Sequence, residues 1–361
     1  MPDFLRKKAA TALGMKYLFA ALLVGLAAAI SFPSRAAEKA RQPALGESPA
    51  VQEFIGEMQA RHRFDAAHLA RLFASIRANP TVLRAIRPAA VPELQRSWQR
   101  YRVRFLNEQR LTQGLRFWRE HHIALVRAEA IYGVPQEIVT AIIGVETEYG
   151  RNTGKFGVLE ALATLAFEYP PRASFFRSEL EQFLLLARES GIPPQNYKGS
   201  YAGAIGIPQF MPSSLRNYAA DFDGDGRIDL SRSAGDAIGS VARFLNVHGW
   251  RPDGPVAVPA SASGDVAALV AAGIKPSIPL REMRKRGVSP LFPEEAARFA
   301  DAPAALIDLV TPGQPTEYWF GFANFYVITR YNRSSFYAMS VFQLAEALRR
   351  ARDEKTQGTA P

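Results

Sequence analysis

The stretch of sequence that decides the fold runs from Val134 to Gly150 and reads VPQEIVTAIIGVETEYG. A proline stands near its beginning, where the first turn of a helix tolerates one, and its last residue is a glycine, which is typical of helix ends. Between these two residues, valine and isoleucine recur at the spacing of an amphipathic helix. The stretch therefore predicts a helix that turns an apolar stripe toward the core.

One acidic residue of this helix falls inside the apolar stripe. At about 100° per residue, Glu146 lies among the valine and isoleucine side chains, whereas Glu137 and Glu148 lie on the opposite face. Contact with apolar side chains favours the neutral form of a carboxyl group. A carboxylic acid that is protonated near neutral pH can donate a proton to a leaving oxygen. Glu146 is thus a candidate catalytic acid; the alternative is a glutamate at the edge of the stripe that reaches water.

A second segment, from Lys198 to Ser214, reads KGSYAGAIGIPQFMPSS. Its glycines permit a close approach between the backbone and a ligand. Ser200 and Gln209 carry hydroxyl and amide groups that suit sugar hydroxyls or an acetamido group, and Phe210 offers an apolar platform. The segment is consistent with a sugar site, and equally with a tight contact between helices that requires small residues.

A third segment, from Asp221 to Asp229, reads DFDGDGRID and matches the start of an EF-hand calcium loop. Aspartates occupy positions 1, 3, 5 and 9, and glycine occupies position 6, where such a loop turns sharply. Position 12 departs from the pattern, because Arg232 stands where a glutamate would chelate calcium. The pattern predicts a metal loop; the alternative is a well-solvated turn.

Composition limits the chemistry that is available to the chain. The 361 residues include no cysteine, which excludes disulfides, cysteine-ligated zinc, a thiol nucleophile and a lipid-modified N-terminal cysteine. Neither a zinc-binding histidine motif, a Gly-x-Ser-x-Gly elbow nor a phosphate loop is present. The formal charge of +10 favours polyanions, a class that includes nucleic acid, acidic lipid and peptidoglycan.

The N-terminus has the order of an export signal. A basic flank precedes the apolar run Tyr17–Ile30, and small residues follow at Ser34, Ala36 and Ala37. The run is shorter than the roughly 20 residues that span a membrane, although a retained anchor is an open alternative. We expect a periplasmic protein that is not a lipoprotein, has no stable membrane span and meets no nucleic acid.

The remaining sequence indicates a mainly α fold of the α+β class. Helical spacing dominates as far as Trp250, and then prolines and short β-rich runs appear, including the aromatic run Tyr318–Thr329. Helical spacing returns over Phe336–Arg350. We expect a signal peptide over 1–37, a linker and helical domain over 38–127, a catalytic core with the EF-hand-like loop over 128–250, a small mixed α/β insertion over 251–325, and a return to helix with a C-terminal tail over 326–361.

Three motifs together resemble the lytic murein transglycosylase B family, which is glycoside hydrolase family 103. They are Gly144–Arg151 (GVETEYGR), Leu159–Leu165 (LEALATL) and Gly206–Ser214 (GIPQFMPSS). The likeness extends from about Trp98 to Leu348. It implies a lysozyme-like core that is flanked by a helical domain and a small mixed domain.

The resemblance also implies roles for individual residues. Glu146 would be the catalytic acid and base, and Asp236 would close a lengthened metal loop in place of the missing glutamate. The sequence departs from the family at Phe175 and Phe244, where tyrosines are expected. The implied substrate-binding residues are Ser200, Gln209, Phe210, Tyr101, Tyr331, Asn332 and Tyr337, and the implied metal ligands are Asp221, Asp223, Asp225, the backbone carbonyl of Arg227, and Asp236.

The implied reaction cleaves the β-1,4 bond between N-acetylmuramic acid (MurNAc) and N-acetylglucosamine (GlcNAc) and leaves 1,6-anhydro-MurNAc ends. Glycosidases generally use two carboxyl groups, but no second carboxylate here has a comparable motif, so the acetamido group of the substrate would assist. A hydrolytic muramidase and a non-catalytic wall-binding protein are the alternatives. We expect a structural Ca²⁺, no catalytic cofactor, a monomer, and as partners the glycan strands and other cell-wall enzymes.

Overall fold

The structure is a computed structural model that describes residues 44–88, 97–264 and 266–357. The predicted signal peptide lies outside these ranges. Within them, no helix combines the length and the apolar character that crossing a membrane requires. The described residues form two compact units, which we call unit 1 (97–107 and 245–350) and unit 2 (44–88, 108–244 and 351–357).

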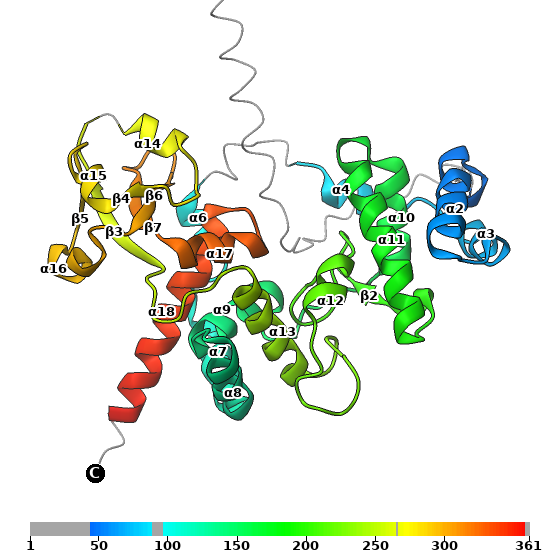
Figure 1. The fold of residues 1–361 in the computed structure, drawn as a ribbon, viewed down its shortest axis with the longest axis horizontal. Coiled ribbons are helices and arrows are strands. Elements are labelled where there is room, and N and C mark those ends of the chain that lie inside the picture. The colour runs from blue at the N-terminus through cyan, green and yellow to red at the C-terminus, as the bar shows by residue number, and fades with distance from the viewer. Residues whose placement is uncertain (1–43, 89–96, 265, 358–361) are drawn as a thin grey trace, which may run out of the picture. The chain divides into compact units, whose positions relative to one another are not determined.

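Unit 2 is built almost entirely of helices, with one two-stranded antiparallel ribbon formed by β1 and β2. Its longer helices begin with α2 and continue through α13, whose last residues belong to unit 1 (Figure 1). The elements are α2 (Pro49–His62), α3 (Ala66–Ala74), α4 (Pro80–Ile86), α7 (Glu108–Glu120), α8 (His122–Tyr132), α9 (Gln136–Thr147), β1 (Phe156–Gly157), α10 (Val158–Glu168), α11 (Ala173–Ser190), β2 (Lys198–Gly199), α12 (Pro212–Tyr218) and α13 (Ala234–Val247), together with the short 3₁₀ helices η1 (Leu45–Glu47), η2 (Pro170–Arg172) and η3 (Pro194–Asn196).

Capping residues and aromatic contacts explain the N-terminal part of unit 2. The side chains of Asp65 and Asn79 accept backbone N–H groups at the first turns of α3 and α4. Three phenylalanines from α2, α3 and α10 then meet edge to face, with ring centroids 5.9–6.4 Å apart. Each such pair adds about 0.5–1.5 kcal/mol to the burial of its apolar area, so the short helices are held against α10.

Unit 1 contains a five-stranded sheet of strand order β4-β6-β7-β3-β5, in which every neighbouring pair is antiparallel. A cluster that includes Val288, Leu306, Phe320 and Phe322 forms its core. The elements are α6 (Trp98–Arg102), β3 (Ala257–Ala262), α14 (Ala267–Ala271), β4 (Ile278–Pro279), α15 (Leu280–Arg284), β5 (Val288–Pro290), α16 (Pro293–Ala296), η4 (Ala297–Phe299), β6 (Pro303–Leu309), β7 (Glu317–Gly321), α17 (Ala323–Tyr331) and α18 (Ser335–Gln357), the last residues of which belong to unit 2.

Two sequence-based expectations differ from the structure. The aromatic run Tyr318–Thr329 was expected to be one strand, but β7 ends at Gly321 and α17 follows directly. Strand and helix both bury aromatic and β-branched residues, so composition does not separate them here. Residues 97–107 belong to unit 1 and not to the helical domain predicted over 38–127, because Trp98 N donates to Val310 O and Gln99 N donates to Thr311 Oγ1.

Candidate active site

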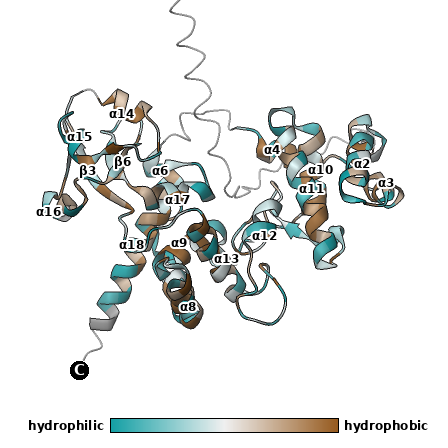
Figure 2. Cartoon of the chain, in the orientation of Figure 1, coloured by the Kyte–Doolittle hydropathy of each residue, from teal (hydrophilic) through white to brown (hydrophobic). Residues whose placement is uncertain are grey.

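Helix α9 carries the candidate acid at the point where the helix leaves the core. Every residue from Ile138 to Val145 is buried, and hydrophobic colours dominate the helix in Figure 2. Glu146 is partly exposed, whereas Thr147, the last residue of the helix, is only 1% exposed. The helix is therefore buried around its whole circumference over Ile138–Val145, and not along one stripe as predicted, and Glu146 is the first partly exposed residue after this stretch.

The helix ends in a left-handed turn. Glu148, Tyr149 and Gly150 have φ angles of 50°, 61° and 85°. A left-handed conformation costs a residue other than glycine about 1–2 kcal/mol, so two such residues in succession require support from their surroundings. Glu148 is thus not on the opposite face of the helix, as the helical wheel predicts, because the helix stops at Thr147.

The turn folds back onto the helix because residue 144 is a glycine. A Cβ atom at Gly144 would lie 2.6 Å from the ring of Tyr149, which is closer than real Cβ contacts. The ring also lies 5.6 Å from that of Phe117 on α7. Burial raises the pKa of the Tyr149 hydroxyl, so this group acts as a neutral hydrogen-bond donor.

A buried cation of α7 contacts both sides of the same turn. Arg110 is 8% exposed; its Nη1 donates to Gly144 O and its Nη2 to Glu148 Oε1, at 3.0 Å in the second case. Tyr149 Oη donates to Arg110 O at 3.0 Å. Burial lowers the pKa of Arg110, and the negative charge of Glu148 opposes this shift. The residues on either side of Glu146 are therefore attached to α7.

Thr147 joins the acid's helix to the segment with the proposed sugar-binding groups. Its Oγ1 donates to Ile207 O at 2.8 Å and accepts from Gly150 N at 3.0 Å. The same segment meets the residue after the metal loop at Gly206, where a Cβ atom would lie 2.5 Å from Leu230 O, and Ile207 N donates to that oxygen at 2.7 Å. The end of α9, the segment Lys198–Ser214 and the metal loop therefore form one connected region of unit 2.

Within this segment the predicted residues differ in their exposure. Ser200 Oγ accepts from Ala204 N at 3.0 Å, and Gln209 Nε2 donates to Thr153 O at 3.0 Å. Both side chains are partly exposed. Phe210 is only 2% exposed, which gives its ring little surface for contact with a sugar. Its burial indicates a packing role, in place of the exposed platform that the sequence suggested.

The two departures from the family pattern take different environments. Phe244 is buried, with ring centroids 5.7 Å from Phe210 and 5.1 Å from Tyr218. Phe175 is 38% exposed, and the guanidinium carbon of Arg172 lies 4.4 Å from the centre of its ring. Neither ring carries a hydroxyl group, so each position contributes apolar or cation–π contact only.

A carboxylate that the sequence did not single out supports the end of the segment. Glu179 of α11 is 5% exposed and accepts from both Ser213 N and Ser213 Oγ, at 2.9 and 2.6 Å. Burial raises the pKa of this carboxyl, and the two hydrogen bonds oppose the shift. Arg110, Thr147 and Glu179 gave no signal in the sequence, because their partners lie 34 to 60 positions away along the chain.

Unit 1 contains the other predicted substrate-binding residues, around the start of α18. The ring of Tyr101 lies 5.6 Å from that of Phe336, and Tyr331 stacks on Tyr337 at 6.4 Å with an interplanar angle of 14°. Asn332 follows the last residue of α17 in an extended conformation. Tyr337 is fully buried, so its ring supports Tyr331 and exposes no face to a ligand in this structure.

The metal loop gathers three of its predicted carboxylates. One oxygen each from Asp221, Asp223 and Asp236 lies within 4.8 Å of the others. Asp236 is 1% exposed and accepts from Phe222 N at 2.7 Å and Asp229 N at 2.8 Å. Such a set of oxygen ligands suits Ca²⁺.

A fourth predicted ligand, Asp225, has a different partner. Asp225 is not part of the three-carboxylate group, and its Oδ1 accepts from Arg227 N at 2.8 Å. Asp221 accepts from Gly224 N and Gly226 N, which have φ angles of 82° and 85°. The glycines therefore allow the loop to wrap around its first aspartate, as an EF-hand loop does.

An acid at the solvent-exposed end of a buried helix, beside a glycine-rich segment with amide and hydroxyl groups, supplies the kinds of groups that a glycan-cleaving enzyme uses. Comparison with known proteins makes this specific. The family model for the transglycosylase SLT domain matches residues 46–346. The chain therefore belongs to the SLT transglycosylase family, and it is an enzyme.

Individual relatives agree with this family. The membrane-bound lytic murein transglycosylase B of Escherichia coli (strain K12) is 41% identical over 317 residues, which is 85% of each chain. The solved structure of the soluble lytic transglycosylase SltB1 from Pseudomonas aeruginosa is 46% identical with a TM-score of 0.76, and covers 84% of this chain and 100% of its own. The Escherichia coli lytic transglycosylase Slt35, solved in complex with calcium, is 40% identical with a TM-score of 0.74, and covers 86% and 96%. The mainly α, lysozyme-like fold is thereby confirmed.

Proposed function

We propose that this lytic transglycosylase cleaves the β-1,4 bond between MurNAc and GlcNAc in peptidoglycan, with Glu146 as its one catalytic carboxyl group. Membership of the family supports the reaction class. The observation that carries the residue assignment is the position of Glu146, at the solvent-exposed end of a helix whose preceding eight residues are buried.

A second catalytic carboxylate would stabilise the positive charge at C1 of the sugar. The substrate is better placed for this role than Glu148, the next glutamate along the chain. Glu148 is held in an ion pair with the buried Arg110, which offsets the negative charge that a second catalytic carboxylate would have to supply. In substrate-assisted glycosidases, the acetamido group of the sugar stabilises the positive charge that develops at C1. MurNAc carries such a group, so a single protein acid is sufficient.

The reaction is balanced in two proton transfers. Glu146 first gives its proton to the glycosidic oxygen, the bond from that oxygen to C1 of MurNAc breaks, and GlcNAc leaves with a new hydroxyl group. The ionised Glu146 then takes the proton of the C6 hydroxyl of the same MurNAc, whose oxygen forms the new bond to C1. The products are a 1,6-anhydro-MurNAc end and a regenerated acid, and no water is consumed.

Each unit contains further predicted side chains that would bind the glycan strand. In unit 2, Ser200 and Gln209 present polar groups that suit the acetamido groups. In unit 1, Tyr331 and Asn332 present an aromatic face and an amide, and Tyr101 presents a further aromatic ring. Phe210 and Tyr337 would act from beneath the surface, as supports for the neighbouring residues.

The proposal includes the cellular setting and one bound ion. We expect export by the signal peptide over 1–37, a periplasmic monomer, and contacts with glycan strands and other cell-wall enzymes. Asp221, Asp223 and Asp236 would hold Ca²⁺, with Asp225 and the carbonyl of Arg227 as further oxygen donors. The ion would stabilise the loop that contacts Gly206, and the proton transfers at Glu146 need no metal.

Mass spectrometry of the soluble products of purified sacculi tests the reaction. Muropeptides that end in 1,6-anhydro-MurNAc, one water lighter than reducing ends, are expected. Reducing MurNAc ends would instead mean hydrolysis at the same acid. If folded, calcium-loaded protein released nothing, the chain would be a wall-binding protein.

Substitution of the acid tests the residue assignment. Glu146→Gln should fold normally and lose about a hundred- to ten-thousandfold in kcat, because an amide has no proton to give at neutral pH. Glu137→Gln, in the first turn of the same helix, is the matched control and should leave kcat within twofold of the wild type. Substantial turnover by Glu146→Gln would remove Glu146 from the catalytic role.

Removal of calcium tests the metal loop. At a calcium concentration a hundredfold above Kd, the ion stabilises the folded state by about 2.7 kcal/mol, which corresponds to a rise in Tm of about 5–10 °C. Asp236→Asn keeps the hydrogen-bond acceptor of this residue but removes its charge, and should abolish most of the rise. A chelator-stripped wild type that shows no heat of calcium binding and no change in Tm would contradict the site.

A further inference from the structure

The turn that follows Glu146 needs an external support, because its backbone is strained. Glu148 and Tyr149 are both left-handed, and each costs about 1–2 kcal/mol in that conformation. A turn of this kind persists only where its surroundings over-determine it. The turn begins two residues after Glu146, so a shift of its backbone would move the acid.

One residue of α7 supplies contacts on both sides of the acid. The guanidinium of Arg110 donates to Gly144 O, two residues before Glu146, and to Glu148 Oε1, two residues after it. The backbone carbonyl of Arg110 accepts from Tyr149 Oη at 3.0 Å. These three bonds enclose the segment that carries Glu146, so that α7 and the end of α9 hold each other in one geometry.

The burial of this cation is difficult to explain by stability alone. The side chain of Arg110 is 9% exposed and that of Glu148 is 31% exposed. Removing a charge from water is costly, and replacement of a buried ion pair by well-packed apolar residues is often neutral or stabilising. An apolar residue at position 110 would fill the space, but it would leave the strained turn without its forked donor.

We propose that Arg110 is a positioning residue for catalysis, which sets the orientation of the Glu146 carboxyl by fixing the left-handed turn of Glu148 and Tyr149 to α7. The inference rests on the proposed role of Glu146. Displacement of a catalytic group by about 1 Å lowers a rate by about a hundredfold. Loss of this support should therefore lower kcat much more than it changes KM.

Three substitutions weaken the support to different degrees. Arg110→Lys keeps the positive charge but presents no forked donor for Gly144 O and Glu148 together. It should lower kcat by about ten- to a hundredfold and change KM by less than about threefold. Glu148→Gln keeps an acceptor for Arg110 but removes its charge, Tyr149→Phe removes the bond to Arg110 O, and each should lower kcat by about three- to tenfold.

A matched control separates positioning from a general loss of stability. Arg177 of α11 forms a bidentate pair with Glu57 of α2, at 2.5 and 3.1 Å, and neither residue belongs to the turn. Arg177→Lys should lower Tm by a few degrees and leave kcat of the folded enzyme unchanged. Rates are measured on purified sacculi well below Tm, with the folded fraction verified by circular dichroism, and the kcat–pH profile is recorded for each variant.

The outcomes distinguish the positioning role of Arg110 from the catalytic role of Glu146. A lowered kcat with unchanged KM and a displaced pH profile in folded Arg110→Lys supports positioning. An unchanged kcat in Arg110→Lys, Glu148→Gln and Tyr149→Phe, while Glu146→Gln is inactive, overturns the inference and leaves the catalytic acid in place. If Arg110→Lys does not fold, the other two variants decide. An active Glu146→Gln refutes the proposed acid, whatever the Arg110 variants do.

Discussion

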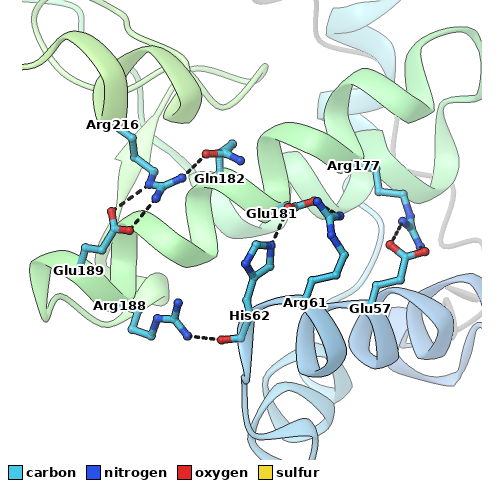
Figure 3. A network of polar contacts seen from close by, with 9 residues as sticks. All are labelled: Glu57, Arg61, His62, Arg177, Glu181, Gln182, Arg188, Glu189 and Arg216. Atoms are coloured by element: carbon cyan, nitrogen blue, oxygen red, sulfur yellow. Dashed lines mark hydrogen bonds and ion pairs between the residues drawn. The ribbon is translucent and has the colours of Figure 1, made fainter.

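Two arginine–glutamate ion pairs of unit 2 differ in their burial and in the backbone to which they are attached. Arg110–Glu148 lies at the end of α9, with side chains 9% and 31% exposed. Arg177–Glu57 joins α11 to α2, with side chains 27% and 38% exposed (Figure 3). The first pair supports a strained turn beside the candidate acid, and the second connects two regular helices.

The second pair is one of several contacts along α11, as Figure 3 shows. Glu181 accepts from Arg61 and pairs with His62, at 2.9 and 2.7 Å. Arg188 Nη1 donates to His62 O at 2.7 Å. Surface ion pairs contribute roughly 0–1 kcal/mol each, and the Glu181 side chain, at 13% exposed, is more buried than that of Glu57. Burial of the arginine and strain in the adjoining backbone, and not the type of pair, distinguish Arg110–Glu148 from Arg177–Glu57.

The largest loss of stability is expected from a substitution at Thr147, which, like Arg110, connects the end of α9 to another segment of unit 2. Thr147→Val removes a buried hydroxyl that bonds to Ile207 O and Gly150 N, and leaves both backbone groups without that partner. We expect a loss of about 2–4 kcal/mol in the free energy of unfolding and a clear fall in kcat, measured by urea denaturation and sacculus digestion.

Thr140→Val is its control on the same helix. Thr140 is fully buried, but its hydroxyl donates only within α9, to Gln136 O at 2.8 Å. This substitution should cost less than about 1 kcal/mol and leave kcat unchanged. Equal losses from both variants would mean that the link to Ile207 has no special importance.

A smaller effect is expected from pH at the buried carboxyl of Glu179. Its pKa in the folded state is raised from 4.5 by burial, so the folded protein holds this proton more tightly than the unfolded chain. The stability that results is fully present below pH 4.5 and is lost as the pH rises through the folded pKa. Relative to Glu179→Gln, the wild type should therefore become less stable as the pH rises above 4.5, in thermal melts recorded at several pH values.

Glu57 should show the opposite trend. The hydrogen bond from Arg177 lowers the pKa of this carboxyl from 4.5, so its contribution is present above pH 4.5 and is lost as the pH falls through the folded pKa. If Glu179→Gln and Glu57→Gln changed stability with pH in the same direction, the distinction between the buried and the partly exposed carboxylate would be wrong.

The smallest change in stability is expected when salt screens the partly exposed pair of Arg177 and Glu57. Glu57→Gln should destabilise the protein by about 1 kcal/mol or less at low ionic strength, and the difference should shrink toward zero in 1 M salt. The activity of the folded enzyme should not change. A salt-independent loss of several kcal/mol would show that this pair is not a surface contact of the ordinary kind.

Local patterns of sequence predicted much of the fold and of the candidate site. The helix that begins after Pro135, the strands near 257 and 305, and the final helix were all expected from spacing and composition. The grouping of Asp221 and Asp223 follows from a loop in which the ligands are close along the chain. The aromatic run Tyr318–Thr329 was misjudged because strand and buried helix have the same composition.

The sequence by itself determined the family, the candidate acid and the metal loop, because each is written in contiguous residues whose spacing is local. Only the tertiary structure decided that Arg110 holds the turn after Glu146, and that Thr147 bonds to Ile207. It also decided that Phe210 and Tyr337 are buried supports. These facts depend on contacts between segments far apart along the chain, and a pattern of neighbouring residues contains no record of which distant backbone group a side chain will meet.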